Sequence, residues 1–235
     1  MKNVYRIAGK NVEIEHSYSY FSNMAQSYLY NDEPDFIITV TDADMEKEKG
    51  LADSLEYPDF YLESLAIYRK LCNKLIDYGT ILFHSSVVAV DGKAYMFAAP
   101  SGTGKSTHTS LWRELFGERA VMVNDDKPLI TVCGDRITVH GTPWNGKANL
   151  GSNMSAQIAG ICFISRGEKN SIERMEKSKI LPLLMSQTYR PESKLGTAKM
   201  MSTLTGISSN IPIWRLYCNM DVEAAQIAYN AMSNV

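Results

Sequence analysis

The stretch APSGTGKST, residues 99–107, constrains this chain more than any other. The apolar run AYMFAA that overlaps its start predicts a strand, and HTSLWREL after it predicts a helix. A glycine-rich loop between a strand and a helix directs backbone N–H groups and the positive end of the helix dipole at one point. The Lys-Ser pair adds a cation and a hydroxyl, so the stretch is typical of a loop that holds a polyphosphate together with Mg²⁺.

The strict pattern for such a loop, G-x-x-x-x-G-K-[ST], requires glycine where this chain has Ala99. Alanine is the smallest replacement and fits if this position needs no positive φ. Lys105 is expected to reach the outer phosphates, and Ser106 to offer its hydroxyl to Mg²⁺. The expected nucleotide-binding residues are Ser101, Gly102, Thr103, Gly104, Lys105, Ser106 and Thr107. A polar surface loop that happens to contain lysine is the alternative, and the flanking strand and helix argue against it.

The composition is that of an ordinary soluble globule, with 235 residues, 45% of them hydrophobic and 21% charged. A net charge of −2 provides no basic field for nucleic acid or for an anionic membrane. We find no apolar signal segment and no run long enough to span a membrane, so a cytoplasmic protein is expected. The four cysteines form no CxxC pair and are expected to be buried free thiols.

Hydrophobic periodicity predicts the elements around this loop. Strands are expected at 4–7 and 12–15 as a hairpin, and at 35–40, 81–90, 93–98, 120–124, 129–132, 137–140, 158–165, 171–176 and 211–218. Helices are expected at 61–78, 108–115, 180–187, 198–204 and after Asp221, which is expected to cap the last one. The charged stretch 41–50 is expected to be a solvated acidic loop, and 171–176 to pair with 158–165.

The turn Asp91-Gly92 is a strong signal for a two-residue hairpin. The strand that enters the glycine-rich loop therefore has an antiparallel neighbour, which predicts a mixed sheet. We expect an α/β fold in two parts with a soft boundary. Residues 1–79 would form an N-terminal β-rich region plus a helix, and residues 80–235 a P-loop core.

Phosphoryl transfer requires a metal ligand, a base or orienting group and positive charge near the transferred group. The tetrapeptide Asn-Asp-Asp-Lys at 124–127 supplies candidates at the end of a predicted strand. Two adjacent carboxylates need compensation, which a bound Mg²⁺ provides. A polar turn before Pro128 is the alternative. His84 lies on the predicted strand next to the one that enters the loop, where a structural role is the more common one.

The segment LFHSSVVAVDGKAYMFAAPSGTGKST, followed by VNDDKP, resembles the superfamily of HPr kinase/phosphorylase and ATP-dependent phosphoenolpyruvate carboxykinase. Within it, the chain is most similar to short HPr kinase-like proteins, which include kinases of lasso-peptide clusters. The resemblance is close from Ile81 to Pro128, and it implies a mixed-sheet P-loop kinase core. It also implies that Asp126 is the catalytic base and that Asp125 lies nearer the metal.

Two departures from authentic HPr kinases bear on the acceptor. Thr107 stands where they have glutamate, and GTPWNGK at 141–147 replaces their later glycine-rich signature, so neither HPr itself nor the reverse reaction is expected. A carboxykinase would need a longer chain. The resemblance implies a kinase that uses ATP and Mg²⁺, with catalytic roles for Lys105, Asp125, Asp126 and His84.

The acceptor of the phosphoryl group stays open at this point. The candidate substrate contacts are Trp144, Lys147 and Arg166, for which packing or solvation is at least as common. A serine of a peptide or protein is the first candidate acceptor and a small-molecule hydroxyl the second. A nucleotide-binding regulatory module without transfer activity is the third reading, against which the intact pair of aspartates argues. A homo-oligomer is possible by analogy with HPr kinases.

Overall fold

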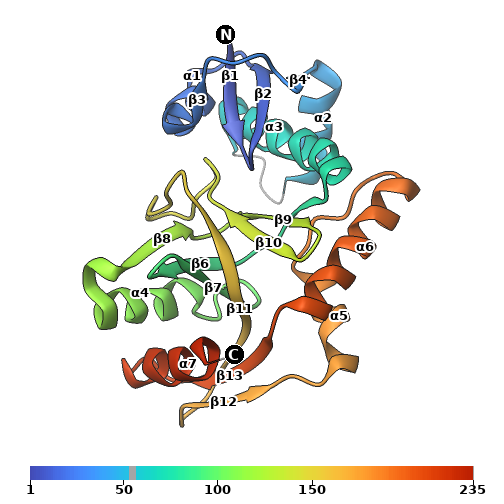
Figure 1. Ribbon diagram of the computed structural model, residues 1–235. Helices are drawn as coiled ribbons and strands as arrows, with labels where there is room; N and C mark the ends of the chain where they lie inside the picture. Colours follow the sequence, from blue (N-terminus) through green and yellow to red (C-terminus); the bar gives the residue numbers. More distant parts are fainter. Residues whose placement is uncertain (53–56, 235) are drawn as a thin grey trace.

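The computed structural model describes residues 1–52 and 57–234, and within these residues the strands form two sheets. The smaller sheet lies at one end of the molecule with the first helices, and the larger sheet lies below it with helices on both faces (Figure 1). The expected α/β class with a mixed sheet is confirmed. The division of the chain near residue 79 stays a prediction, because one apolar cluster contains side chains from both sides of that boundary.

The smaller sheet is built on the expected N-terminal hairpin. Strands β1 (Lys2–Ile7) and β2 (Lys10–Glu15) pair antiparallel across Ala8 and Gly9, which both have positive φ as a type I′ turn requires. Short strand β3 (Leu29–Tyr30) extends the sheet beside β1, and β4 (Phe36–Thr39) extends it beside β2. The strand expected at 35–40 is therefore an edge strand, and of its four residues only Ile38 is buried.

Helix α1 (Ser19–Met24), a 3₁₀ turn (Gln26–Tyr28) and helix α3 (Asp59–Leu75) cover one face of this sheet. The expected helix at 61–78 is confirmed: a 3₁₀ turn (Ile76–Tyr78) continues α3, and Gly79 ends it in the left-handed region at φ 68°. A Cβ at Gly79 would also lie 2.8 Å from the carbonyl oxygen of Val132, so both conformation and space favour glycine here.

The loop expected at 41–50 is instead a helix, α2 (Asp42–Leu51). Thr41 and Asp44 form a reciprocal capping box at its start, in which each side chain accepts a hydrogen bond from the other residue's backbone N–H. Glu48 is buried and pairs with Arg69 of α3, which ties the helix to the rest of the fold. The many charged residues of this segment indicated a loop, but a capping box and ion pairs stabilise it as a helix.

The larger sheet has the strand order β5-β9-β10-β11-β7-β6-β8 in the described residues, with β13 beside β11 and β12 beside β13. The strand expected at 81–90 is two strands, and 171–176 pairs with β13 and not with 158–165 as expected. The bounds are β5 (Thr80–Leu82), β6 (Ser86–Val90), β7 (Lys93–Ala98), β8 (Ala120–Asn124), β9 (Leu129–Cys133), β10 (Arg136–His140), β11 (Ser155–Arg166), β12 (Ser171–Arg174) and β13 (Ile213–Cys218).

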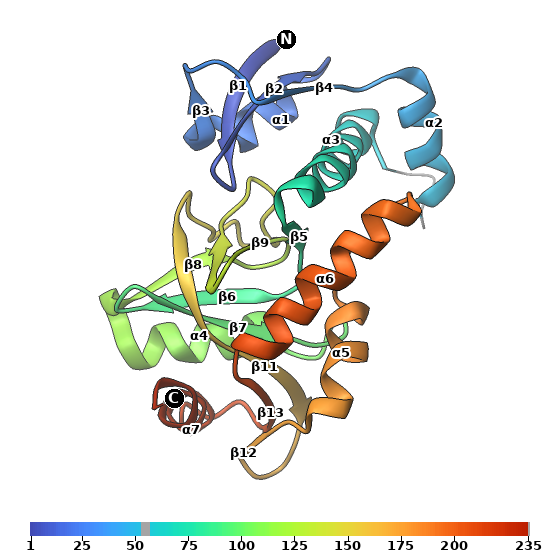
Figure 2. The same ribbon diagram turned by 45° about the vertical axis from the view of Figure 1, so that its right-hand side comes forward.

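Helices pack on both faces of this sheet (Figure 2). On one face, α4 (Lys105–Phe116) and α7 (Glu223–Ser233) bury Trp112 and Ala228 against Phe97. On the other face, α5 (Lys177–Ser186) and α6 (Lys194–Asn210) bury Leu184 and Leu204. The start of α7 differs from the expectation, because Val222 precedes the helix and no side chain caps it.

Strand direction decides where functional groups gather. β6 is antiparallel to both β7 and β8, so β7 and β8 run the same way, and β11 and β13 run parallel to β7. The carboxyl ends of these four strands therefore meet at one edge of the sheet, where ligands bind in open α/β sheets.

Two further sequence expectations concern cysteines and membranes. Three of the four cysteines are buried and free as expected, whereas Cys133 is exposed at the end of β9. In residues 1–52 and 57–234, we find no helix with the length and apolar character that crossing a bilayer requires.

Trp144 joins the two parts of the fold, so its removal should destabilise the whole chain. Its indole is 5% exposed, its N–H donates to the Ser64 carbonyl at 3.0 Å, and its ring lies 4.4 Å from that of Tyr68 and 5.4 Å from that of Phe21. We expect Trp144→Ala to lower the free energy of unfolding by about 3–5 kcal/mol in urea titrations. Trp144→Phe should lose clearly less, and equal losses would contradict this packing role.

Candidate functional site

The loop at residues 99–107, called the phosphate loop below, lies between β7 and α4 as expected. Gly102 has φ 74° and Gly104 has φ 120°, and a Cβ on either would meet no atom within 4 Å. Conformation and not crowding therefore requires glycine at both positions. Among the described residues, Ala99 is not one of those with positive φ, so alanine is compatible with the first position.

Backbone N–H groups at the end of the phosphate loop are available to a ligand. The first backbone hydrogen bond of α4 runs from the N–H of His108 to the Gly104 carbonyl, 2.9 Å. The amides of Lys105, Ser106 and Thr107 precede it, so they have no acceptor one turn back in the helix. With the positive end of the α4 dipole, they form a place where an anion is stabilised. Ser106 and Thr107 are exposed, as are Ser101 and Gly102, whereas Thr103 and Gly104 are half-buried.

Lys105 is buried, with 8% of its surface exposed, and its Nζ donates to the Ala99 carbonyl at 3.0 Å. Burial lowers the pKa of Lys105, while the negative charges of Asp126 and Asp125 act in the opposite direction. The two carboxylates therefore lie within electrostatic reach of the Lys105 ammonium group. The structure brings together the loop and the acidic residues that the sequence placed in one site.

Residues 124–127, called the acidic corner below, are shaped by Asn124, whose side chain is fully buried. Its Oδ1 accepts hydrogen bonds from the N–H groups of Asp126, 2.8 Å, and Lys127, 2.7 Å. Its Nδ2 lies within hydrogen-bond distance of Thr142 and Asn145. Sequence reasoning gave Asn124 no role of its own, although asparagine bonding to the backbone two residues on is a known turn signal.

Asp125 is joined to the helix of the phosphate loop through two hydroxyl groups. Its Oδ1 accepts from Ser86 Oγ at 2.6 Å, and Ser86 Oγ lies 2.8 Å from Thr109 Oγ1 on α4. Ser86 begins β6, between β7 and β8, and its hydroxyl links the end of β8 to the helix that follows β7. A Cβ at Gly146 would lie 2.9 Å from Asp125 Oδ2, so a larger residue at position 146 would crowd the carboxylate. Ser86 and Thr109 were both missed from the sequence.

Asp126 lies between two basic side chains. Its Oδ1 is 3.2 Å from His84 Nε2, and its Oδ2 pairs with Lys127 Nζ. Burial would raise the pKa of Asp126, but the His84 hydrogen bond and the Lys127 charge outweigh it and lower the pKa to about 2. The sequence predicted that His84 lies on a strand, but it lies in the connection between β5 and β6. There its backbone N–H donates to the Gln187 carbonyl at 2.7 Å. Asp126 is thus an ionised carboxylate throughout the physiological range.

The three candidate substrate residues have different surroundings. Arg166, at the end of β11, donates from Nη2 to the Gly102 carbonyl at 2.7 Å and so contacts the phosphate loop itself. Lys147 is exposed in the loop after β10. Trp144 packs in the apolar core, so we correct its expected role as a substrate contact. Only its carbonyl, 3.3 Å from Asn124 Nδ2, belongs to the site.

The donor set fits Mg²⁺ bound together with phosphates. In the described part of the chain, no group of three or more His, Cys, Asp or Glu side chains could hold a metal by itself. Mg²⁺ commonly uses one or two protein oxygens and takes the rest from phosphates and water. Ser106, which is exposed, and the Asp125 carboxylate, whose Oδ1 accepts the Ser86 hydrogen bond, would hold it.

The low pKa of Asp126 can be measured by following its side-chain carboxyl carbon by NMR while the pH is lowered. We expect a midpoint near pH 2 in the wild type. The midpoint should rise in Lys127→Met, because that variant removes an ion pair to the charged form. Since the folded pKa is depressed, the pairing stabilises the fold above the unfolded pKa of about 3.9 and is lost as the pH falls through about 2. An unchanged midpoint in the variant would show that Lys127 does not set it.

Comparisons with known proteins establish no family for this chain. No protein-family model matches the sequence, and no curated protein matches it. Among solved structures, an HPr(Ser) kinase/phosphatase from Coxiella burnetii is a remote structural neighbour. The TM-score is 0.36 and the sequence identity 11%, and the match covers 65% of this chain and 94% of that one.

Proposed function

We propose that this chain is a Mg-ATP-dependent kinase that transfers the γ-phosphoryl group to a hydroxyl, and that the acceptor is a serine of a peptide or protein. One observation carries the proposal. The available amides and buried lysine of the phosphate loop lie within electrostatic reach of two carboxylates, and Ser86 and Thr109 join the two sides by hydrogen bonds. A cradle for phosphates beside two carboxylates is the arrangement that phosphoryl transfer needs.

The roles follow from position. The amides of residues 105–107 and the Lys105 ammonium bind the phosphates, and Arg166 holds the loop through the Gly102 carbonyl. Ser106 and Asp125 would hold Mg²⁺, which when bound supplies positive charge to the phosphate oxygens. The Lys105 ammonium stabilises the charge that develops on the transferred group.

Asp126 orients the acceptor hydroxyl. A carboxylate with a pKa of about 2 is a weak base, so it accepts the hydroxyl hydrogen bond without removing the proton early. Phosphoryl transfer passes through a loose transition state in which the nucleophile needs little activation, so orientation is enough. His84 and Lys127 hold the carboxylate in place and keep it ionised.

Asp126→Asn should keep nucleotide binding and lose transfer. The amide keeps the size of the side chain but not its charge, so transfer of labelled phosphate from ATP to serine-containing peptides should fall by about 10²- to 10⁴-fold. Mg-ATP affinity measured by calorimetry should change little, because the variant leaves the phosphate loop intact.

Asp135→Asn, at an exposed turn between β9 and β10, is the matched control and should retain wild-type transfer. Normal transfer by Asp126→Asn would exclude the assigned role. If labelled phosphate is incorporated only into molecules of a metabolite pool, the acceptor is a small molecule and not a peptide. Tight Mg-ATP binding without any labelled product would indicate a regulatory module.

Arg166→Ala should weaken Mg-ATP binding, because the Gly102 carbonyl loses a charged donor that holds the loop in its binding conformation. We expect a loss of affinity of about tenfold in calorimetric titrations. Arg174→Ala removes a cation of β12 that lies over the Trp214 ring of β13, and this control should bind nucleotide normally. An unchanged affinity for Arg166→Ala would mean that the loop holds its shape without this contact.

A further inference from the structure

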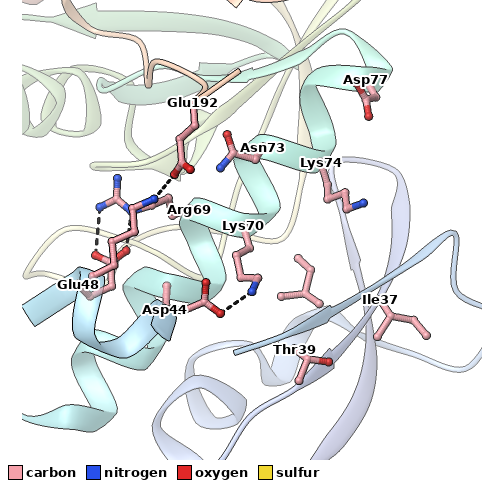
Figure 3. A pocket seen from close by; sticks show the side chains of 13 residues that line it. Ile37, Thr39, Asp44, Glu48, Arg69, Lys70, Asn73, Lys74, Asp77 and Glu192 are labelled. Atoms are coloured by element: carbon pink, nitrogen blue, oxygen red, sulfur yellow. Dashed lines mark hydrogen bonds and ion pairs between the residues drawn. The ribbon is translucent and has the colours of Figure 1, made fainter. Parts of the chain in front are cut away.

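A groove of about 670 Å³ is lined by residues between Ile37 and Asp77 and by Glu192, and its lining includes no residue of the phosphate loop. Strand β4 lines it on one side and helices α2 and α3 line it on the other (Figure 3). In residues 1–52 and 57–234, β4 pairs only with β2, so its other edge is open. Ile37 of this strand is 56% exposed, whereas Ile38 and Ala66, which also line the groove, are buried.

The pairing of β2 decides which backbone groups of β4 face outward. His16, just after β2, exchanges both hydrogen bonds with Met1 at 2.9 and 2.7 Å, so the even-numbered residues of β2 bond toward β1. Glu13 therefore directs its N–H and C=O toward β4, where Ile37 is its partner in register. In a parallel ladder only one residue of a registered pair points at the other strand, so Ile37 points its N–H and C=O away from β2.

The same holds two residues later, at Thr39, which is also exposed and lines the groove. The open edge of β4 thus presents two N–H and C=O sets, at Ile37 and Thr39, next to a groove. Such an edge is a template for pairing with another extended chain.

The charges that line the groove are balanced except at one residue. Three of the lining cations are neutralised by lining carboxylates, in the pairs Lys47–Glu192, Arg69–Glu48 and Lys70–Asp44. The remaining carboxylate, Asp77, pairs at 2.7 Å with Lys199, which does not line the groove. In the part of the chain that the structure describes, Lys74 is the lining cation for which no partner is recorded. A ligand that enters the groove therefore meets one uncompensated positive charge.

We propose that β4 binds an extended peptide as an added strand, with a carboxylate of the peptide paired to Lys74 and an apolar side chain over Ile38 and Ala66. Main-chain hydrogen bonds to Ile37 and Thr39 supply affinity, and the alternating side chains supply specificity. A second copy of this chain paired through its own β4 fits less well. A two-fold interface repeats the same patch, Lys74 included, and the carboxylates that line it are already paired.

Peptide binding at β4 does not depend on the proposed kinase function. A role of this binding in catalysis does rest on that proposed function. Helix α3 carries Arg69 into the groove, and the preceding residue, Tyr68, donates its hydroxyl to the Lys127 carbonyl of the acidic corner at 2.9 Å. An extended peptide advances about 3.3 Å per residue, so a few residues beyond the groove carry it along the molecule. A docked peptide would thereby raise the local concentration of its serine near the acidic corner.

Selection from a phage-displayed library of random linear peptides, without nucleotide, tests the proposal. We expect selected peptides to carry Asp or Glu beside apolar residues. Synthetic copies should slow hydrogen exchange at the Ile37 and Thr39 amides. Ile37→Pro removes an outward N–H and should weaken binding by about tenfold or more, as the loss of main-chain hydrogen bonds predicts. Ile37→Val, which keeps that N–H, should bind as the wild type does.

Lys74→Glu should also weaken binding, whereas Lys93→Glu, the same change at an exposed lysine of β7, should not. Equal binding by Ile37→Pro and the wild type, or no peptide selected above a protein-free surface, would overturn the proposal. So would a wild-type dimer that Ile37→Pro converts to a monomer in light scattering. Because Asp126→Asn should bind the same peptides, failure of the kinase assay and failure of peptide binding are separate results.

Discussion

The hydroxyl of Ser86 holds the two sides of the candidate site together. It is fully buried, and it connects the Asp125 carboxylate at the end of β8 with Thr109 on the helix that follows the phosphate loop. The link exists because β6 lies between β7 and β8 and runs against both, so the start of β6 meets the ends of its neighbours. Topology thus fixes the distance between the phosphate loop and the carboxylates, and buried hydroxyls fix their orientation.

The N-terminal part of the chain reaches the same corner from the other side. The hydroxyl of Tyr68 and the side chain of Thr142 both donate to the Lys127 carbonyl, and Trp144 packs on the Tyr68 ring while its own carbonyl lies near Asn124. The small sheet and α3 are therefore not independent of the acidic corner. A partner that contacts α3 therefore contacts a helix that is itself hydrogen-bonded to the acidic corner through Tyr68.

Local signals predicted much of this structure. The pairing of the first two strands, the hairpin at Asp91-Gly92, the amphipathic helix α3 and the glycines of the phosphate loop depend on local backbone preferences and periodicity. The first turn itself lies at Ala8-Gly9, one residue before the expected Gly9-Lys10-Asn11. The region of residues 41–50 was mispredicted because its helix is held by a cap and by Glu48–Arg69, a contact 21 residues apart in sequence. Pairing of β12 with β13 and not β11 is likewise set by distant residues.

For the candidate site, the sequence indicated the residues with recognisable chemistry and missed those that position them. Lys105, Asp125 and Asp126 stood out by motif and charge, whereas Asn124, Ser86 and Thr109 are common polar residues whose roles arise from burial at one strand edge. For Trp144 the sequence left packing and substrate contact open, because an aromatic residue in a glycine-rich loop has the same local sequence in both cases, and the structure shows it packed.

The most direct measurement is a crystal structure of the protein with Mg²⁺ and a non-hydrolysable ATP analogue. The account predicts phosphates on the amides of residues 105–107 and the terminal phosphate between Lys105 and Asp126, with Asp125 and Ser106 at the metal. A nucleotide bound elsewhere, or an acidic corner that contacts neither the metal nor the terminal phosphate, would contradict it.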